Sequence, residues 1–204
     1  VLNGDMPLIT TKTLRQFLNY SQGNSSDISV ISFIAGDPSS YGRIVRDGYG
    51  KAVRIVEDKD ATPEQKNIRE VNSGVYAIKP AVMNLLSKIK INKKKGEYYL
   101  TDILEIAAKE GLNTGVYCLP AETELLGVNT RQELSKAEKI HLGRTIKELT
   151  EKGVVFVNSD SVYIHTSVKV GRETLIYPNV FLEGNTRVGS GCTIYPNVRL
   201  KDST

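Results

Sequence analysis

The sequence has few of the residues that build disulfide frameworks and transition-metal sites. Its 204 residues include two cysteines, two histidines and no tryptophan. Cys118 and Cys192 lie far apart, and neither His141 nor His165 has a Cys or Asp partner at a metal-binding spacing. We therefore expect no disulfide framework, interpret both histidines as structural, and favour a reduced, cytoplasmic setting.

Long apolar runs are also missing. No run of about 18 apolar residues and no signal peptide is present, which predicts no membrane span. The net charge of +4 and pI near 8.9 favour anionic ligands such as nucleotides and sugar phosphates, but are too weak to indicate nucleic acid. The one dense basic run, at residues 93–95, is interpreted as a solvated loop, with a role in attracting phosphate as the alternative.

The first ten residues, VLNGDMPLIT, resemble the end of a buried strand followed by a loop. We expect Val1 and Leu2 to close that strand, with Asp5 just beyond its carboxyl end, where ligands bind in open α/β sheets. Gly4 allows close approach of a ligand. A carboxylate there suits Mg²⁺, which prefers oxygen ligands shared with phosphates. The alternative is that Asp5 is a solvated turn residue.

Strands alternate with helices over the first 128 residues, which predicts an α/β sandwich. A buried strand at 27–35 is typical of a mostly parallel sheet. The other expected strands are 41–45 and 52–56, which form a hairpin, then 71–78, 115–119 and 124–128. Helices are expected over 13–20, from Pro80 to near Ile89, and from Ile103, where Thr101 or Asp102 provides the cap.

A long helix follows. Residues 130–133, TRQE, fit a capping box, and apolar residues recur at helical spacing until Gly153. We interpret this helix as a connecting arm between two domains.

The last fifty residues carry a six-residue repeat. Large apolar side chains recur at Ile164, Val170, Ile176, Leu182, Val188, Ile194 and Leu200, each preceded by two positions by a smaller one: Val162, Val168, Thr174, Val180, Thr186, Cys192 and Val198. The segment 176–180, IYPNV, returns unchanged eighteen residues later, at 194–198. Such hexapeptide repeats predict a parallel β-helix with one side per repeat. Its unfinished end leaves a pairing edge that needs a cap or a partner.

An α/β domain, a long helix and hexapeptide repeats in this order resemble a bacterial bifunctional family of UDP-N-acetylglucosamine synthesis. In it, N-acetylglucosamine-1-phosphate uridyltransferase is joined to glucosamine-1-phosphate N-acetyltransferase. The matching motifs, in family order, are LNGDMPL at 2–8, YGRI at 41–44, IVEDKDAT at 55–62, Asn72, EYYLTD at 97–102 and GVNTR at 127–131.

The resemblance implies a fold in three parts. Residues 1–128 would be the sugar-binding part of a Rossmann-like nucleotidyltransferase domain, 129–153 a linker helix, and 154–204 the first coils of a left-handed parallel β-helix. The family's glycine-rich nucleotide loop, its uracil-recognition segment and its acetyltransferase coils have no counterpart here. We therefore expect a segment of a longer protein that is inactive alone.

The resemblance also implies site residues. Asp5 and Asn129 would hold Mg²⁺, and the substrate-binding residues would be Gly42, Glu57, Asn72, Tyr99, Thr101 and Asn129. No catalytic acid–base residue is expected, because the sugar phosphate is itself the nucleophile and the protein mainly positions it and neutralises charge. Each residue has a structural alternative: Asn129 beside a helix cap, Glu57 paired with Lys59, and Asn72 satisfying a strand end.

The implied activity of the parent enzyme is transfer of UMP from UTP to N-acetylglucosamine 1-phosphate, with acetylation of glucosamine 1-phosphate by acetyl-CoA in the other domain. This would supply peptidoglycan and lipopolysaccharide precursors, and the β-helix would form a homotrimer. Two alternatives remain open: a different sugar-1-phosphate nucleotidyltransferase with β-helical coils, or a segment that serves mainly as an assembly module.

Overall fold

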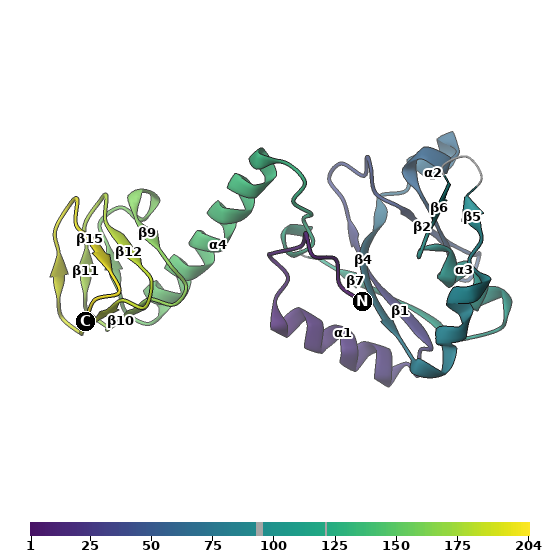
Figure 1. The fold of residues 1–204 in the computed structure, drawn as a ribbon, viewed down its shortest axis with the longest axis horizontal. Helices are drawn as coiled ribbons and strands as arrows, with labels where there is room; N and C mark the ends of the chain where they lie inside the picture. Colours follow the sequence, from purple (N-terminus) through teal and green to yellow (C-terminus); the bar gives the residue numbers. More distant parts are fainter. Residues whose placement is uncertain (93–95, 121) are drawn as a thin grey trace. The chain divides into compact units, whose positions relative to one another are not determined.

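The computed structural model describes residues 1–92, 96–120 and 122–204 (Figure 1). The chain divides into two compact units, Val1–Val128 and Asn129–Thr204. The basic run at 93–95 lies outside the described residues, so its interpretation as a solvated loop stays a prediction. No described helix is both long and apolar enough to cross a membrane.

The first unit is built on a five-stranded sheet of order β3-β2-β4-β1-β7. The strands are β1 (Ile28–Ile34), β2 (Arg43–Arg46), β3 (Ala52–Val56), β4 (Glu70–Ile78) and β7 (Thr114–Leu119). Only β1 and β7 pair in parallel, and the other pairings are antiparallel. The predicted hairpin is confirmed, but the expectation of a mostly parallel sheet is wrong. The apolar run of β1 reflects burial on both faces, which a mixed sheet also provides.

Side chains of β1 alternate between two cores. Ile28 and Val30 pack with α3 (Asp102–Lys109) and the 3₁₀ helix η2 (Pro80–Lys88), whereas Ile31 and Phe33 pack with α1 (Thr11–Gly23). Figure 1 shows α1 and α3 on opposite sides of the sheet, which is the predicted α/β sandwich. The shorter elements are η1 (Asp58–Asp60), α2 (Pro63–Lys66), β5 (Ile91–Asn92), β6 (Glu97–Tyr98) and η3 (Glu122–Glu124).

The expected strand at the start of the chain is wrong. Val1 and Leu2 are 61% and 53% exposed and belong to no strand. The amino group of Val1 donates to the Tyr76 carbonyl oxygen, and the Tyr76 N–H donates back to Val1. The segment therefore lies against β4 through a single residue, and its apolar side chains are not buried by a neighbouring strand.

The expected strand at 124–128 is also wrong. The chain there forms η3 and then irregular backbone. One oxygen of the Glu124 carboxylate accepts hydrogen bonds from the Thr10 N–H and the Thr13 hydroxyl. Glu124 therefore serves to fix the beginning of α1, where Thr10 is the N-cap.

The long helix of the second unit is α4 (Arg131–Glu151). The predicted capping box is confirmed: the Thr130 hydroxyl accepts from the Glu133 N–H, and the Glu133 carboxylate accepts from the Thr130 N–H. The helix ends before Gly153, whose φ of +91° explains why glycine stands there.

Loss of this cap has a measurable expected effect. Thr130→Ala is expected to destabilise the first turn of α4 by about 0.5–2 kcal/mol. Hydrogen bonds from the Asn129 backbone, the Thr130 side chain and the Thr130 backbone lower the pKa of Glu133. Its contribution is therefore present at neutral pH and is lost as the pH falls through that lowered pKa.

Amide hydrogen exchange of the first turn of α4 measures both effects. The matched control is Thr150→Ala, because Thr150 is exposed near the far end of the same helix. Equal protection of the first turn in wild type and Thr130→Ala, or protection in wild type that does not change between neutral and acidic pH, would contradict the role of the box.

The remaining strands of the second unit pair in parallel. They form three small sheets of order β14-β11-β8, β15-β12-β9 and β10-β13. The strands are β8 (Val155–Phe156), β9 (Tyr163–Ile164), β10 (Lys169–Val170), β11 (Leu175–Ile176), β12 (Phe181–Glu183), β13 (Arg187–Val188), β14 (Thr193–Ile194) and β15 (Arg199–Lys201), and the 3₁₀ turn η4 (Ser159–Ser161) precedes β9.

The parallel strands stack so that residues eighteen positions apart in the sequence pair with each other. Leu182 pairs with Leu200 and Ile176 pairs with Ile194, the eighteen-residue spacing that the sequence shows. The repeating side chains that are buried are Val162, Ile164, Val168, Thr174, Ile176, Val180, Leu182, Thr186 and Ile194. At the turns, Asn179 and Asn197 have φ of 60° and 65°, and the Asn179 amide donates to the Asn197 side-chain oxygen at 3.3 Å. The prediction that the repeat points inward on parallel strands is confirmed.

Candidate functional site

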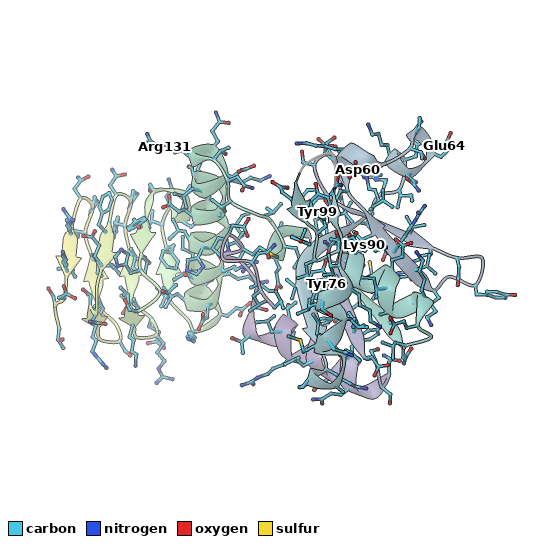
Figure 2. All side chains as sticks on the ribbon, turned by 45° about the vertical axis from the view of Figure 1, so that its right-hand side comes forward. Asp60, Glu64, Tyr76, Lys90, Tyr99 and Arg131 are labelled. Carbon is cyan, nitrogen blue, oxygen red and sulfur yellow. The ribbon has the colours of Figure 1, made fainter. Side chains whose placement is uncertain are left out.

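A polar cleft of about 560 Å³ opens in the first unit. Its lining residues are Ser40, Glu57, Asp58, Lys59, Glu97 and Tyr99. Glu57 and Asp58 follow β3, and Tyr99 follows β6, so the cleft lies where the hairpin meets the segment before α3. Tyr99, labelled in Figure 2, is one of the predicted substrate-binding residues.

Glu57 is held in the cleft by a side chain from another element. The Thr101 hydroxyl donates to Glu57 Oε1 at 3.0 Å. Thr101 is the N-cap of α3, but it makes no side-chain capping bond. Thr101 therefore occupies the expected cap position, but its hydroxyl makes no capping bond because it donates to Glu57. The alternative that Glu57 pairs with Lys59 has no support in the hydrogen bonds and ion pairs of the described residues.

Gly42 lies against the same carboxylate. A Cβ atom on Gly42 would stand 2.8 Å from Ile55 Cγ2 and 3.5 Å from Glu57 Oε1. Contacts of 2.8 Å between carbon atoms are repulsive, so a side chain there would displace the hairpin or the carboxylate. Glycine thus keeps the space beside Glu57 open.

Asn72 is joined to Gly42 through the backbone. Its N–H donates to the Gly42 carbonyl oxygen at 2.8 Å, and its side-chain oxygen accepts from the Gly74 N–H at 2.9 Å. The register of β1 and β4 shifts at this point, and Gly74 has a φ of +82°. Such a bulge changes the direction in which neighbouring side chains point, and bulges often occur beside functional sites. The direction of the Asn72 side chain is therefore set by this bulge. The Asn72 side chain thus does satisfy a backbone donor, but it does so within β4 and not at a strand end.

The structure thus brings together most of the predicted substrate-binding residues. Gly42, Glu57, Asn72 and Thr101 are connected by the bonds and close contacts above, and Tyr99 lines the same cleft. They come from four segments that are distant in sequence. Their proposed contacts with a ligand remain predictions.

The predicted metal ligands lie on different units. Asp5 is exposed, and its carboxylate makes no hydrogen bond or ion pair with any described residue. Its carbonyl oxygen accepts from the Val128 N–H at 2.8 Å. Asn129 is exposed and donates its N–H to Glu133 Oε2, so it does lie beside the helix cap. Over residues 1–92, 96–120 and 122–204, no three His, Cys, Asp or Glu side chains are grouped to hold a metal.

The sequence reasoning missed an ion pair between a buried arginine and a carboxylate of the cleft. Arg43 is among the largest fully buried side chains, and its guanidinium donates to the Tyr41 carbonyl oxygen and to Asp58 Oδ1, the latter at 2.7 Å. Asp58 lines the cleft. The sequence did carry a signal, because an arginine stands between Gly42 and the apolar residues of a strand. Arginine side chains are usually solvated, so an arginine in such a position indicates a paired, buried guanidinium.

A solved structure shows a similar fold. The structure of CMP:2-keto-3-deoxy-manno-octonic acid synthetase complexed with CTP aligns with a TM-score of 0.50. The alignment covers 70% of this chain and 61% of that chain, at 16% identity, so it bears on the fold alone.

The decisive comparison is with protein families. The model of the nucleotidyl transferase family matches residues 1–123. This chain belongs to the nucleotidyl transferase family. Its first unit is therefore nucleotidyltransferase structure of the α/β, Rossmann-like class that the motifs predicted, with a mixed sheet.

Full-length relatives of this nucleotidyl transferase extend the likeness into the second unit. This chain is 46% identical over 182 residues to the bifunctional protein GlmU of Thermodesulfovibrio yellowstonii. It is 43% identical over 183 residues to the bifunctional protein GlmU of Caldanaerobacter subterraneus subsp. tengcongensis. Each match covers 89% of this chain and 40% of the relative. The chain thus spans about two fifths of the length of these relatives. The identity to them confirms the resemblance drawn from the motifs.

Proposed function

We propose that the first unit contains the sugar-phosphate site of a uridylyltransferase. In the intact enzyme, a phosphate oxygen of N-acetylglucosamine 1-phosphate attacks the α-phosphorus of UTP. The bond from that phosphorus to the leaving pyrophosphate breaks, and UDP-N-acetylglucosamine forms. The observation that carries this proposal is the linkage of Gly42, Glu57, Asn72 and Thr101 beside one polar cleft.

Each residue has a proposed part. The Glu57 carboxylate accepts hydrogen bonds from sugar hydroxyls, and the Asn72 carboxamide donates to an oxygen of the sugar or its acetamido group. Gly42 leaves room for close approach of the ring. Tyr99 bounds the cleft on the side of α3, and the Thr101 hydroxyl orients Glu57. Such fixed positioning can supply much of the rate of phosphoryl transfer.

The proposed metal is Mg²⁺, with the Asp5 carboxylate and the Asn129 amide oxygen as protein ligands. The fit rests on donor chemistry: both are hard oxygen donors, and Asp5 has no competing partner among the described residues. A small number of protein ligands is enough for Mg²⁺, because waters and phosphates fill the rest of its coordination shell. When bound, the ion would neutralise phosphate charge. Line broadening by the paramagnetic stand-in Mn²⁺ that is unchanged in Asp5→Asn would contradict this assignment.

The second unit has a proposed role in assembly and in the partner activity. We propose that its parallel strands begin a left-handed β-helix of the kind that forms homotrimers, and that the intact protein also uses acetyl-CoA. The eighteen-residue register of β9 to β15 supports the β-helix. Light scattering that finds the intact protein strictly monomeric would contradict the trimer.

Ligand-detected NMR on the 204-residue chain tests the sugar site. With N-acetylglucosamine 1-phosphate we expect saturation transfer to the ring protons and the acetamido methyl group. Glu57→Gln is expected to weaken binding about tenfold or more, because a hydrogen bond to a charged group contributes about 1.5–3 kcal/mol. The matched control is Glu151→Gln, an exposed carboxylate of α4.

The same titration separates the alternatives. Equal affinity for glucose 1-phosphate would favour a different sugar-nucleotide enzyme. Absence of binding to any sugar phosphate, or unchanged affinity in Glu57→Gln, would contradict the proposed site.

A further inference from the structure

Three buried side-chain atoms in the described part of the chain have no hydrogen-bond partner: Ser26 Oγ, Arg43 Nε and Tyr76 Oη. Leaving such a group unpaired costs about 1–3 kcal/mol, so native proteins keep few of them. Two of the three belong to residues on β2 and β4, the strands that also carry Gly42's neighbour and Asn72. Tyr76 Oη is therefore an unpaired group on the strand that carries Asn72.

Tyr76 lies on the same face of β4 as Asn72. Tyr76 stands opposite Val30 on β1 and Asn72 stands opposite Ser32, two residues along the same strand. Side chains of opposed residues share a face, and residues two apart on a strand share a face too. The bulge at Gly74 therefore does not move Asn72 and Tyr76 to different sides of the sheet.

That face is the one on which the cleft is built. Tyr76 is only 4% exposed, and it packs in one cluster with Ile55 and Ile103. Ile55 lies two residues before Glu57, and Ile103 lies two residues after Thr101. The Tyr76 ring therefore forms part of the support under these site residues. In Figure 2, Tyr76 and Tyr99 are both labelled on this unit.

The polar surroundings of the Tyr76 hydroxyl also come from the site. Burial raises the pKa of Tyr76, the nearby Asn72 side chain opposes that rise, and the negative charge of Glu57 adds to it. The hydroxyl therefore stays protonated at neutral pH. The Asn72 side chain is thus close enough to act on the hydroxyl, yet Oη has no hydrogen-bond partner among the described residues.

We propose that Tyr76 is a positioning residue of the sugar site, whose hydroxyl orients the Asn72 carboxamide toward a bound sugar phosphate. The Asn72 oxygen is already held by the Gly74 N–H. Its amide nitrogen carries two hydrogens, so it can donate one to Tyr76 Oη and the other to the ligand. Binding would thus complete the hydrogen bond that the hydroxyl lacks. This inference rests on the proposed function.

Tyr76→Phe in the 204-residue chain is the direct test, since it removes one oxygen atom and keeps the ring. We expect the dissociation constant for N-acetylglucosamine 1-phosphate to rise about twofold to tenfold, the range for one neutral hydrogen bond. The melting temperature should be unchanged or higher, because an unpaired buried hydroxyl has been removed. Tyr98→Phe, on an exposed side chain of β6, is the matched control.

A second readout does not depend on ligand binding. The side-chain amide resonances of Asn72 in a ¹⁵N-labelled chain should shift in Tyr76→Phe and stay in place in Tyr98→Phe. Unchanged Asn72 resonances, or an unchanged affinity, would overturn the positioning role. A wild-type chain that binds no sugar phosphate would instead overturn the proposed function, and the Asn72 resonances would still decide whether Tyr76 orients that side chain.

Discussion

Phe33→Ala is expected to lower the free energy of unfolding of the first unit by about 3–5 kcal/mol. Phe33 is fully buried on β1 and packs with Phe17, Val71 and Leu125. Its ring also meets Tyr41 edge to face, with centroids 5.3 Å apart and planes at 87°, an arrangement that adds stability beyond the buried area. Alanine would leave a cavity that a mixed sheet covered on both faces cannot readily close.

The cavity is also expected to loosen the sugar site. Tyr41 directly precedes Gly42, and its carbonyl oxygen accepts from the buried Arg43 guanidinium. Losing the ring contact should increase hydrogen exchange of β2 and β3, the strands of the hairpin, beyond the global loss of stability. Exchange measured by mass spectrometry resolves these peptides from those of the second unit.

The matched control is Phe181→Ala, because Phe181 is 45% exposed on β12. It should destabilise the protein far less, by an amount confined to the second unit. A loss below about 1 kcal/mol in Phe33→Ala would contradict the assignment of this ring to the core.

Leu182→Ala is expected to cost the second unit about 2–5 kcal/mol. Leu182 is fully buried on β12 and stands between Ile164 and Leu200 in neighbouring turns of the stack. Removing it leaves a void with apolar neighbours above and below, and the parallel register prevents their side chains from moving into it. Denaturation followed by far-UV circular dichroism and by exchange of the second-unit peptides would measure the loss.

Leu134→Ala provides the comparison, since Leu134 is 47% exposed on α4 and the substitution is the same. We expect a change within about 0.5 kcal/mol there. Equal effects of the two substitutions would mean that the six-residue repeat does not form the core of this unit.

The repeat was predictable because it is local and redundant. Each six-residue repeat contains the same pair of inward side chains. The buried positions of Ile176 and Leu182 could therefore be predicted without knowing the rest of the fold. The helix with its capping box at Thr130 was predictable for a similar reason, since the signal lies within four residues. The resemblance supplied the site residues, and the structure gathers Gly42, Glu57, Asn72 and Thr101.

The errors share another cause. Val1 and Leu2 look like the end of a strand, but burial depends on a neighbour that no local pattern specifies. The apolar run at β1 indicates burial without indicating the direction of β4 beside it. Thr101 is of a residue type that caps helices, yet its hydroxyl donates a hydrogen bond to Glu57, which is distant in sequence. Long-range pairings of this kind decide which of several local options a polar side chain takes.

The turns at Asn179 and Asn197 bear on how such a protein can be lengthened. Each copy of the IYPNV segment carries its own left-handed turn residue and its own inward side chains, and the Asn179 amide donates to the Asn197 side chain of the other copy. Duplicating one eighteen-residue block inside the stack would reproduce every neighbour relation, whereas adding seventeen or nineteen residues would turn the inward row out to water. A stack of this kind can therefore be lengthened by whole eighteen-residue blocks, because each block needs only its neighbours above and below.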